Sequence, residues 1–149
     1  MPRELKAAPS TQAECFRLGG EIRELQGQQR NLQNDVAVTE TEIAELRFMI
    51  AEIEQEIANI QFAEDTARAE GSRAGIGGVI ASEVTAGAIR LAMQKDSLER
   101  ERDQRKAGLS RLERQLNDRR RRLEEVGYLL SRLHDAFVGL GCSASTIPF

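Results

Sequence analysis

The chain has 149 residues, of which 30% are charged and 4% are aromatic, and its formal net charge is −3. A compact globular core needs bulky apolar side chains, so a chain with no Trp and one Tyr favours long helices that pack through narrow aliphatic stripes. Residues 10–70 hold 13 acidic and 5 basic side chains, whereas residues 88–140 hold 9 acidic and 13 basic ones. Opposite charge favours pairing of these two halves with each other.

Residues 1–10 form an N-terminal arm that carries charge but lacks the apolar core of a signal peptide, so no classical export route is expected. Nowhere does the chain contain about 20 consecutive uncharged apolar residues, the length that spans a bilayer. We therefore expect no membrane span.

Residues 11–70 are predicted to form the first helix, with Thr11 and Glu14 at the spacing of a capping box. Alternating steps of three and four residues from Cys15 reach a nearly unbroken apolar series. Such a seam is buried only against another helix, which predicts coiled-coil packing. Its members are Cys15, Leu18, Ile22, Leu25, Gln29, Leu32, Val36, Thr39, Ile43, Leu46, Ile50, Ile53, Ile57 and Ile60.

A reversal of the chain is predicted at residues 71–78, which contain Gly71, Gly75, Gly77 and Gly78. Gly71 supplies a left-handed stop for the first helix. The same segment does not predict a nucleotide site, because it lacks the Lys-Ser/Thr ending of a phosphate-binding loop.

The second helix is predicted over residues 79–140, and an extended tail over residues 141–149. A second apolar series runs along this helix: Leu109, Leu112, Leu116, Arg119, Leu123, Val126, Leu130, Leu133, Phe137 and Leu140. The tail ends in Ile147, Pro148 and Phe149, a short apolar hook suited to docking in a groove of a neighbour. A disordered end is the alternative.

The two apolar series match when the helices run antiparallel. Cys15 then lies opposite Leu140, and the midpoint of the pairing falls between Gly77 and Gly78. The same register predicts three ion pairs beside the seam, namely Glu40–Arg120, Arg47–Glu113 and Asp35–Arg122. Turn chemistry and register thus favour an all-α antiparallel helical hairpin.

A stretch without any apolar residue, 99–106, lies opposite part of the isoleucine-rich seam. We therefore expect helices from several chains to cover this seam, and isoleucine at successive core positions favours a homotrimeric bundle. The predicted oligomer interface comprises Ile43, Leu46, Ile50, Ile53, Ile57, Ile60, Phe48 and Phe62. The alternative fold is a straight parallel trimeric coiled-coil fibre, in which Arg119 forms a polar core layer.

Cys15 and Cys142 both fall at the base of a hairpin, so they are candidates for a disulfide. The alternative is two reduced thiols, with Cys15 buried in the seam. A bridge would indicate a virion or extracellular location, and reduced cysteines a cytoplasmic one.

No other group of residues predicts chemistry. The arginine run at 119–122 points in all directions around a helix and is flanked by acids, which predicts salt bridges rather than nucleic-acid binding. The single histidine, His134, has no partners for a metal or catalytic site. We expect no enzyme activity, no cofactor and no metal.

These patterns predict a non-enzymatic structural coiled coil that forms a rod, fibre or collar element of a larger assembly, for example a bacteriophage virion neck or tail. Its partners would be further copies of itself and other structural proteins. A second hypothesis is an adaptor or assembly chaperone that binds a partner helix through residues 50–62. A third is a membrane-active hairpin led by the glycine-rich turn.

Overall fold

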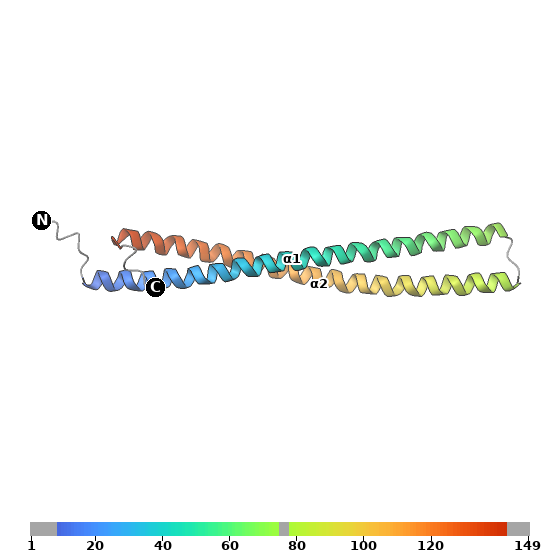
Figure 1. Cartoon of the computed structure of the whole chain (residues 1–149), viewed down its shortest axis with the longest axis horizontal. Helices are drawn as coiled ribbons and strands as arrows, with labels where there is room; N and C mark the ends of the chain where they lie inside the picture. The colour runs from blue at the N-terminus through green and yellow to red at the C-terminus, as the bar shows by residue number, and fades with distance from the viewer. Residues whose placement is uncertain (1–8, 75–77, 143–149) are drawn as a thin grey trace. The chain divides into compact units, whose positions relative to one another are not determined.

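The computed structural model describes residues 9–74 and 78–142, with side chains described at 11–70 and 86–142. They form two α-helices, α1 (Pro9–Ala74) and α2 (Gly78–Gly139), packed against each other as a helical hairpin (Figure 1). The predicted all-α hairpin is confirmed. The straight parallel fibre is wrong, because early residues of α1 contact late residues of α2.

All four helix boundaries differ slightly from the predicted ones, and α1 begins at Pro9 rather than at residue 11. α2 begins at Gly78 and ends at Gly139, within one residue of the prediction. α1 continues through Gly71 to Ala74, so the stop predicted at Gly71 is wrong. A glycine inside a helix costs only about 1 kcal/mol relative to alanine, which the helix tolerates. Gly75 and Gly77, like Ile147, Pro148 and Phe149, lie outside the described residues.

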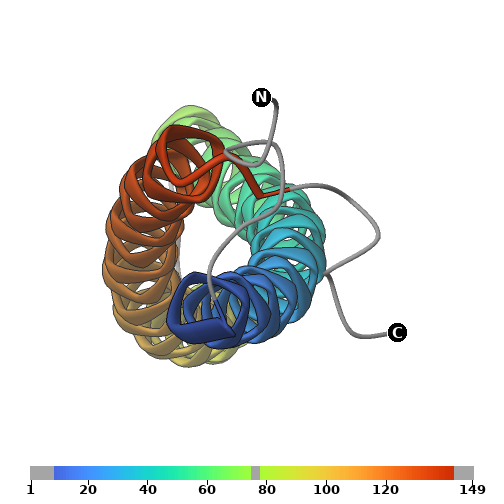
Figure 2. The same cartoon turned by 90° about the vertical axis from the view of Figure 1, so that its left-hand side faces the viewer.

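The helices divide into two compact units. Unit 1 comprises Met1–Glu40 with Arg114–Phe149. Its buried core is built from Cys15, Leu18 and Ile22 of α1 and Phe137 of α2, and three half-buried residues pack against it: Leu130, Leu133 and Cys142. The start of α1 and the end of α2 therefore lie at the same end of this unit, as Figure 2 shows in blue and red.

A polar layer interrupts the apolar seam of unit 1. Thr39 is fully buried, and its hydroxyl donates a hydrogen bond to the Asp35 carbonyl oxygen at 2.7 Å. The Arg119 guanidinium of α2 donates to the same hydroxyl oxygen. Beside this layer, Arg120 pairs with Glu40 at 2.7 Å, as predicted, whereas Arg122 pairs with Glu125 on its own helix rather than with Asp35.

Unit 2 comprises Thr41–Glu113 and has a seam centred on Ile43, Ile50 and Ile53. Two ion pairs join α1 to α2 along one edge of this seam, one helical heptad apart. They are the predicted pair Arg47–Glu113 and a further pair, Glu54–Lys106, each at 3.1 Å. Pairs of this exposed kind contribute only a few tenths of a kcal/mol each, so they select the register more than they stabilise the fold.

Ile50 and Ile53 of the unit 2 seam are covered within the hairpin, contrary to the sequence-based argument for a trimer. Ile50 and Ile53 are each only 7% exposed. Arg102 and Arg105 occupy seam positions of α2, and their side chains are 28% and 35% exposed. Long aliphatic stems cover apolar surface while their charged ends stay in water, which a simple count of apolar residues overlooks. Ile57, Ile60 and Leu46 are half-buried in the same seam.

The polar layer yields a stability prediction. Thr39→Val removes the hydroxyl that accepts the Arg119 hydrogen bond, so we expect a loss of about 1–2 kcal/mol in the free energy of unfolding. Adding Arg119→Leu should recover most of this loss, because no unpaired polar group then remains. Urea unfolding followed by circular dichroism measures both effects.

The matched control is Thr66→Val at an exposed position of α1, expected within about 0.5 kcal/mol of the parent. Equal effects of Thr39→Val and Thr66→Val would contradict a stabilising role for the buried layer.

Candidate interaction surfaces

The C-terminus of α2 ends in a tight glycine-dependent turn. Gly141 has a φ of +73°, in the left-handed region that side chains disfavour. The Gly141 N–H donates to the Val138 carbonyl oxygen at 3.0 Å, and the Cys142 N–H donates to the Phe137 carbonyl oxygen at 3.1 Å. This is the Schellman arrangement, which satisfies the last carbonyl groups of a helix. It turns the chain so that Cys142 packs against the core of unit 1.

The turn brings together the two cysteines that the sequence singled out. Cys15 and Cys142 form a disulfide with a Cα–Cα distance of 5.6 Å, within the range that bridged cysteines adopt. Cys15 itself is almost fully buried. The predicted bridge therefore links the start of α1 to the end of α2.

Three charged side chains form ion pairs on the exposed surface of α1 next to the disulfide, and one of them belongs to Glu14, the residue before Cys15. Arg17 binds Glu14 at 2.7 Å and Glu21 at 2.8 Å, both along α1. The hydrogen bond that Arg17 donates lowers the pKa of the Glu14 carboxyl group. These pairs join residues of a single helix and leave the bridge as the covalent link between the two helices.

The outer face of α1 in unit 2 carries a second regular series of residues. Phe48 and Phe62 are 66% and 74% exposed and lie on the side opposite the isoleucine seam. Steps of four and three residues connect them through exposed positions that carry no charge. This series, here called the outer stripe, consists of Ala44, Phe48, Ala51, Gln55, Ala58 and Phe62.

The sequence-based prediction assigned the isoleucines and, on the far side of the same helix, Phe48 and Phe62 to one oligomer interface. The structure separates them, because the isoleucines face α2 and the phenylalanines face outward. Ala44, Ala51, Gln55 and Ala58 were not predicted as site residues. The signal was their three-and-four spacing, which is hard to recognise because alanine is common on every face of a helix.

The two edges of the outer stripe differ in charge. On the edge nearer the ion pairs, Arg47 and Glu54 are already partnered by α2. The other edge carries Glu45 and Glu52, both exposed. The stripe is therefore an uncharged band with one largely neutralised edge and one acidic edge.

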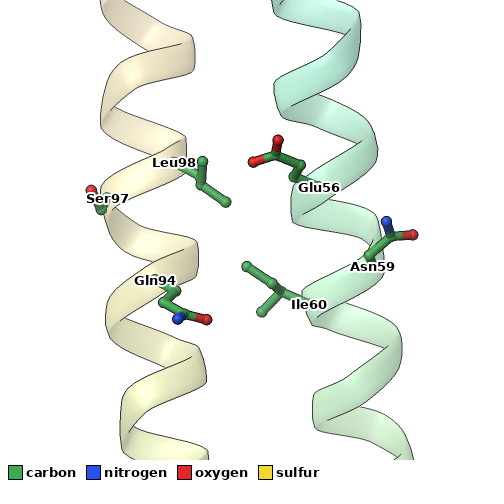
Figure 3. Close-up of a pocket in the computed structure, with 6 residues that line it drawn as sticks. All are labelled: Glu56, Asn59, Ile60, Gln94, Ser97 and Leu98. Atoms are coloured by element: carbon green, nitrogen blue, oxygen red, sulfur yellow. The ribbon is translucent and has the colours of Figure 1, made fainter.

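An open groove of about 520 Å³ lies between α1 and α2 in unit 2 (Figure 3). The side chains of Glu56, Ile60, Gln94 and Leu98 point into the space between the helices, whereas Ser97 points away from it. Half-buried Ile60 and Leu98 form its apolar floor. The groove is open along the helices rather than enclosed, unlike the pockets that bury most of a small molecule's surface.

A polar cluster occupies the seam near this groove. The Lys95 ammonium binds Glu64 at 3.3 Å and donates to the Gln61 amide oxygen at 3.0 Å. The other Glu64 carboxylate oxygen is buried and accepts no hydrogen bond within the described part of the chain. This arrangement resembles a register-setting polar layer, as in the Thr39 layer of unit 1.

The remaining sequence-based candidates show no convergence. Arg119 and Arg120 contact Thr39 and Glu40 of α1, and His134 is exposed. Within residues 9–74 and 78–142, no three His, Cys, Asp or Glu residues are close enough to hold a metal ion. Neither helix, over the portion described, has an apolar run that could cross a bilayer.

Comparisons with known proteins return no relative for this chain. No family model matches it, and neither the curated proteins nor the solved structures include a significant match.

The C-terminal turn predicts opposite effects of the same substitution at two glycines. Gly141→Ala should lower the free energy of unfolding by about 1–2 kcal/mol, because alanine disfavours a positive φ. Gly127→Ala should raise it by up to about 1 kcal/mol, because Gly127 lies within α2 and an added Cβ meets open space. Chemical unfolding of the two variants measures both values. A stabilising Gly141→Ala would contradict the left-handed turn.

The disulfide predicts a stability that depends on redox conditions. The bridge joins residues 127 positions apart, and closing so long a loop contributes ~4–5 kcal/mol in the chain-entropy model. Reduction should therefore lower the melting temperature of the parent protein. The Cys15→Ser/Cys142→Ser double variant should melt at the lower temperature with or without reductant. Identical melting of the reduced and oxidised parent would refute a native bridge.

Proposed function

We propose that this protein is a non-enzymatic structural component whose disulfide-closed helical hairpins bundle with one another in a larger assembly. The observation that supports it best is the outer stripe of α1, a second heptad series left exposed after the first is buried within the hairpin. An exposed apolar series at this spacing is suited to packing against a further helix.

The kinds of surface that the hairpin exposes also support a structural role. The groove and the polar cluster lack a nucleophile–base arrangement, and outside the groove the seams are packed around buried side chains. A hairpin with packed seams presents helix faces, and helix faces recognise other helices. The disulfide supports a working place outside the reducing cytosol, in an extracellular space or within a virion.

The number of copies in the assembly is part of this proposal. The argument for three copies used the run Ile50, Ile53, Ile57 and Ile60, of which the hairpin buries the first two and half-buries the others. The surface available for self-association is instead the outer stripe, with Phe48 and Phe62 as its largest side chains. Light scattering decides between a trimer and other closed assemblies.

A second function is favoured by the acidic edge of the stripe. Glu45 and Glu52 would attract basic residues of another protein's helix, as in an adaptor or assembly chaperone. The adaptor hypothesis differs from the structural one in a single respect: the hairpin would stay monomeric until its partner is added.

Mass in solution tests the proposed function. We expect the oxidised protein to form a defined oligomer by size-exclusion chromatography with light scattering at about 100 µM, a concentration at which even weak helix–helix association is populated. A monomer at every concentration up to that value would refute self-assembly and favour the adaptor. The Cys15→Ser/Cys142→Ser variant, run beside it, shows whether the oligomer depends on the bridge.

A further inference from the structure

We infer that a second copy of this chain packs antiparallel on the outer stripe of α1, with each phenylalanine of one copy set against an alanine of the other. This inference rests on the proposed function, since it names the face and the direction of the association. It uses only residues of unit 2.

The alternation of large and small side chains along the stripe determines how two copies fit. Phenylalanine and glutamine alternate with alanine at every step: Ala44, Phe48, Ala51, Gln55, Ala58, Phe62. In a parallel pair, Phe48 would meet Phe48 and Ala51 would meet Ala51 of the second copy. Layers of two phenylalanines would hold the helices far apart, whereas layers of two alanines need them close together. Straight helices cannot satisfy both, so voids would remain at the alanine layers.

An antiparallel pair removes this mismatch. Phe48 of one copy lies opposite Ala58 of the second copy, and Ala51 lies opposite Gln55. By the two-fold symmetry, Phe62 lies opposite Ala44. Every layer then combines one large and one small side chain, so the two helices can approach evenly along the stripe. The interface is isologous and closes on itself with two copies.

Neighbouring registers fit less well. A shift by one heptad in one direction sets Phe48 opposite Asp65, which would carry a carboxylate into the apolar band. A shift by one heptad in the other direction sets Phe62 opposite a residue that precedes Ala44, so Phe62 would lie beyond the end of the outer stripe. The register with Phe48 opposite Ala58 is the one that covers both phenylalanines within the stripe.

The charges beside the stripe make a distinct prediction for each direction. In the antiparallel pair, Glu52 of one copy lies near Glu52 of the other, so the two carboxylates repel. In a parallel pair, Glu52 would instead lie near Arg47 of the second copy and attract it. Replacing Glu52 with glutamine therefore strengthens the antiparallel pair and weakens a parallel one.

The face of association is tested with a matched pair of variants. Ala58→Glu places a larger, charged side chain where Phe48 of the second copy would pack, and we expect it to weaken self-association by about tenfold or more in sedimentation equilibrium. Ala107→Glu makes the same change at an exposed position on α2 of the same unit, and it should change the association less than about twofold. Circular dichroism shows that both variants keep their helices, since both alanines are exposed.

The direction is tested with Glu52→Gln and with a spin label at Thr66. The native cysteines are bridged, so Thr66→Cys provides a single reactive thiol. At a rise of 1.5 Å per residue, the antiparallel pair separates the two labels by about 40 Å along the helices, whereas a parallel pair keeps them within about 20 Å. A tighter dimer with Glu52→Gln and the longer distance are the expected results.

Each failure has a separate meaning. Self-association that is unaffected by Ala58→Glu, or a short label distance, overturns the antiparallel stripe while the proposed self-assembly stands. A protein that stays monomeric in sedimentation overturns both, and it would leave the stripe to a partner of another sequence.

Discussion

The burial of aliphatic side chains between α1 and α2 is the constraint on which the rest of this structure depends. A single helix cannot remove its own heptad stripe from water. The stripe of α1 is therefore buried only when α2 packs against it, and the stripe of α2 only when α1 does. Ile43, Ile50 and Ile53 show the result in unit 2, and Leu18 with Phe137 shows it in unit 1. Once the seams are closed, the side chains that remain outside become the surfaces available for recognition.

Polar residues within the seams give this apolar packing its specificity. Aliphatic layers spaced by a heptad tolerate a shift of one repeat, because similar side chains replace one another. Thr39 meets Arg119 in the observed register, whereas a shift of one repeat would set it opposite Leu112 or Val126. The ion pairs beside the seams, such as Arg47–Glu113, oppose the same shift. The disulfide then makes the pairing of the first and last turns covalent.

Particular residues show why some features were predictable and others were not. Cys15 and Cys142 could be placed at the same end of the hairpin from the sequence, because a helical hairpin converts residue number directly into position along the helices. The coverage of Ile50 and Ile53 could not, because residue type alone describes Arg102 and Arg105 as charged and ignores their aliphatic stems. The end of α1 was misjudged for a related reason: Gly71 permits a stop without requiring one.

Heptad spacing, the opposite charge of the two halves and the position of the glycines determined, by themselves, that the chain forms long packed helices, and they favoured a hairpin with both cysteines at its base over a straight fibre. A helix has a fixed number of residues per turn, so residue spacing in the sequence predicts which side chains share a face before any contact is known. Only the tertiary structure decided which apolar residues stay exposed. Burial depends on what lies across the seam, and α2 covers Ile50 and Ile53 but leaves Ile57 and Ile60 half-buried.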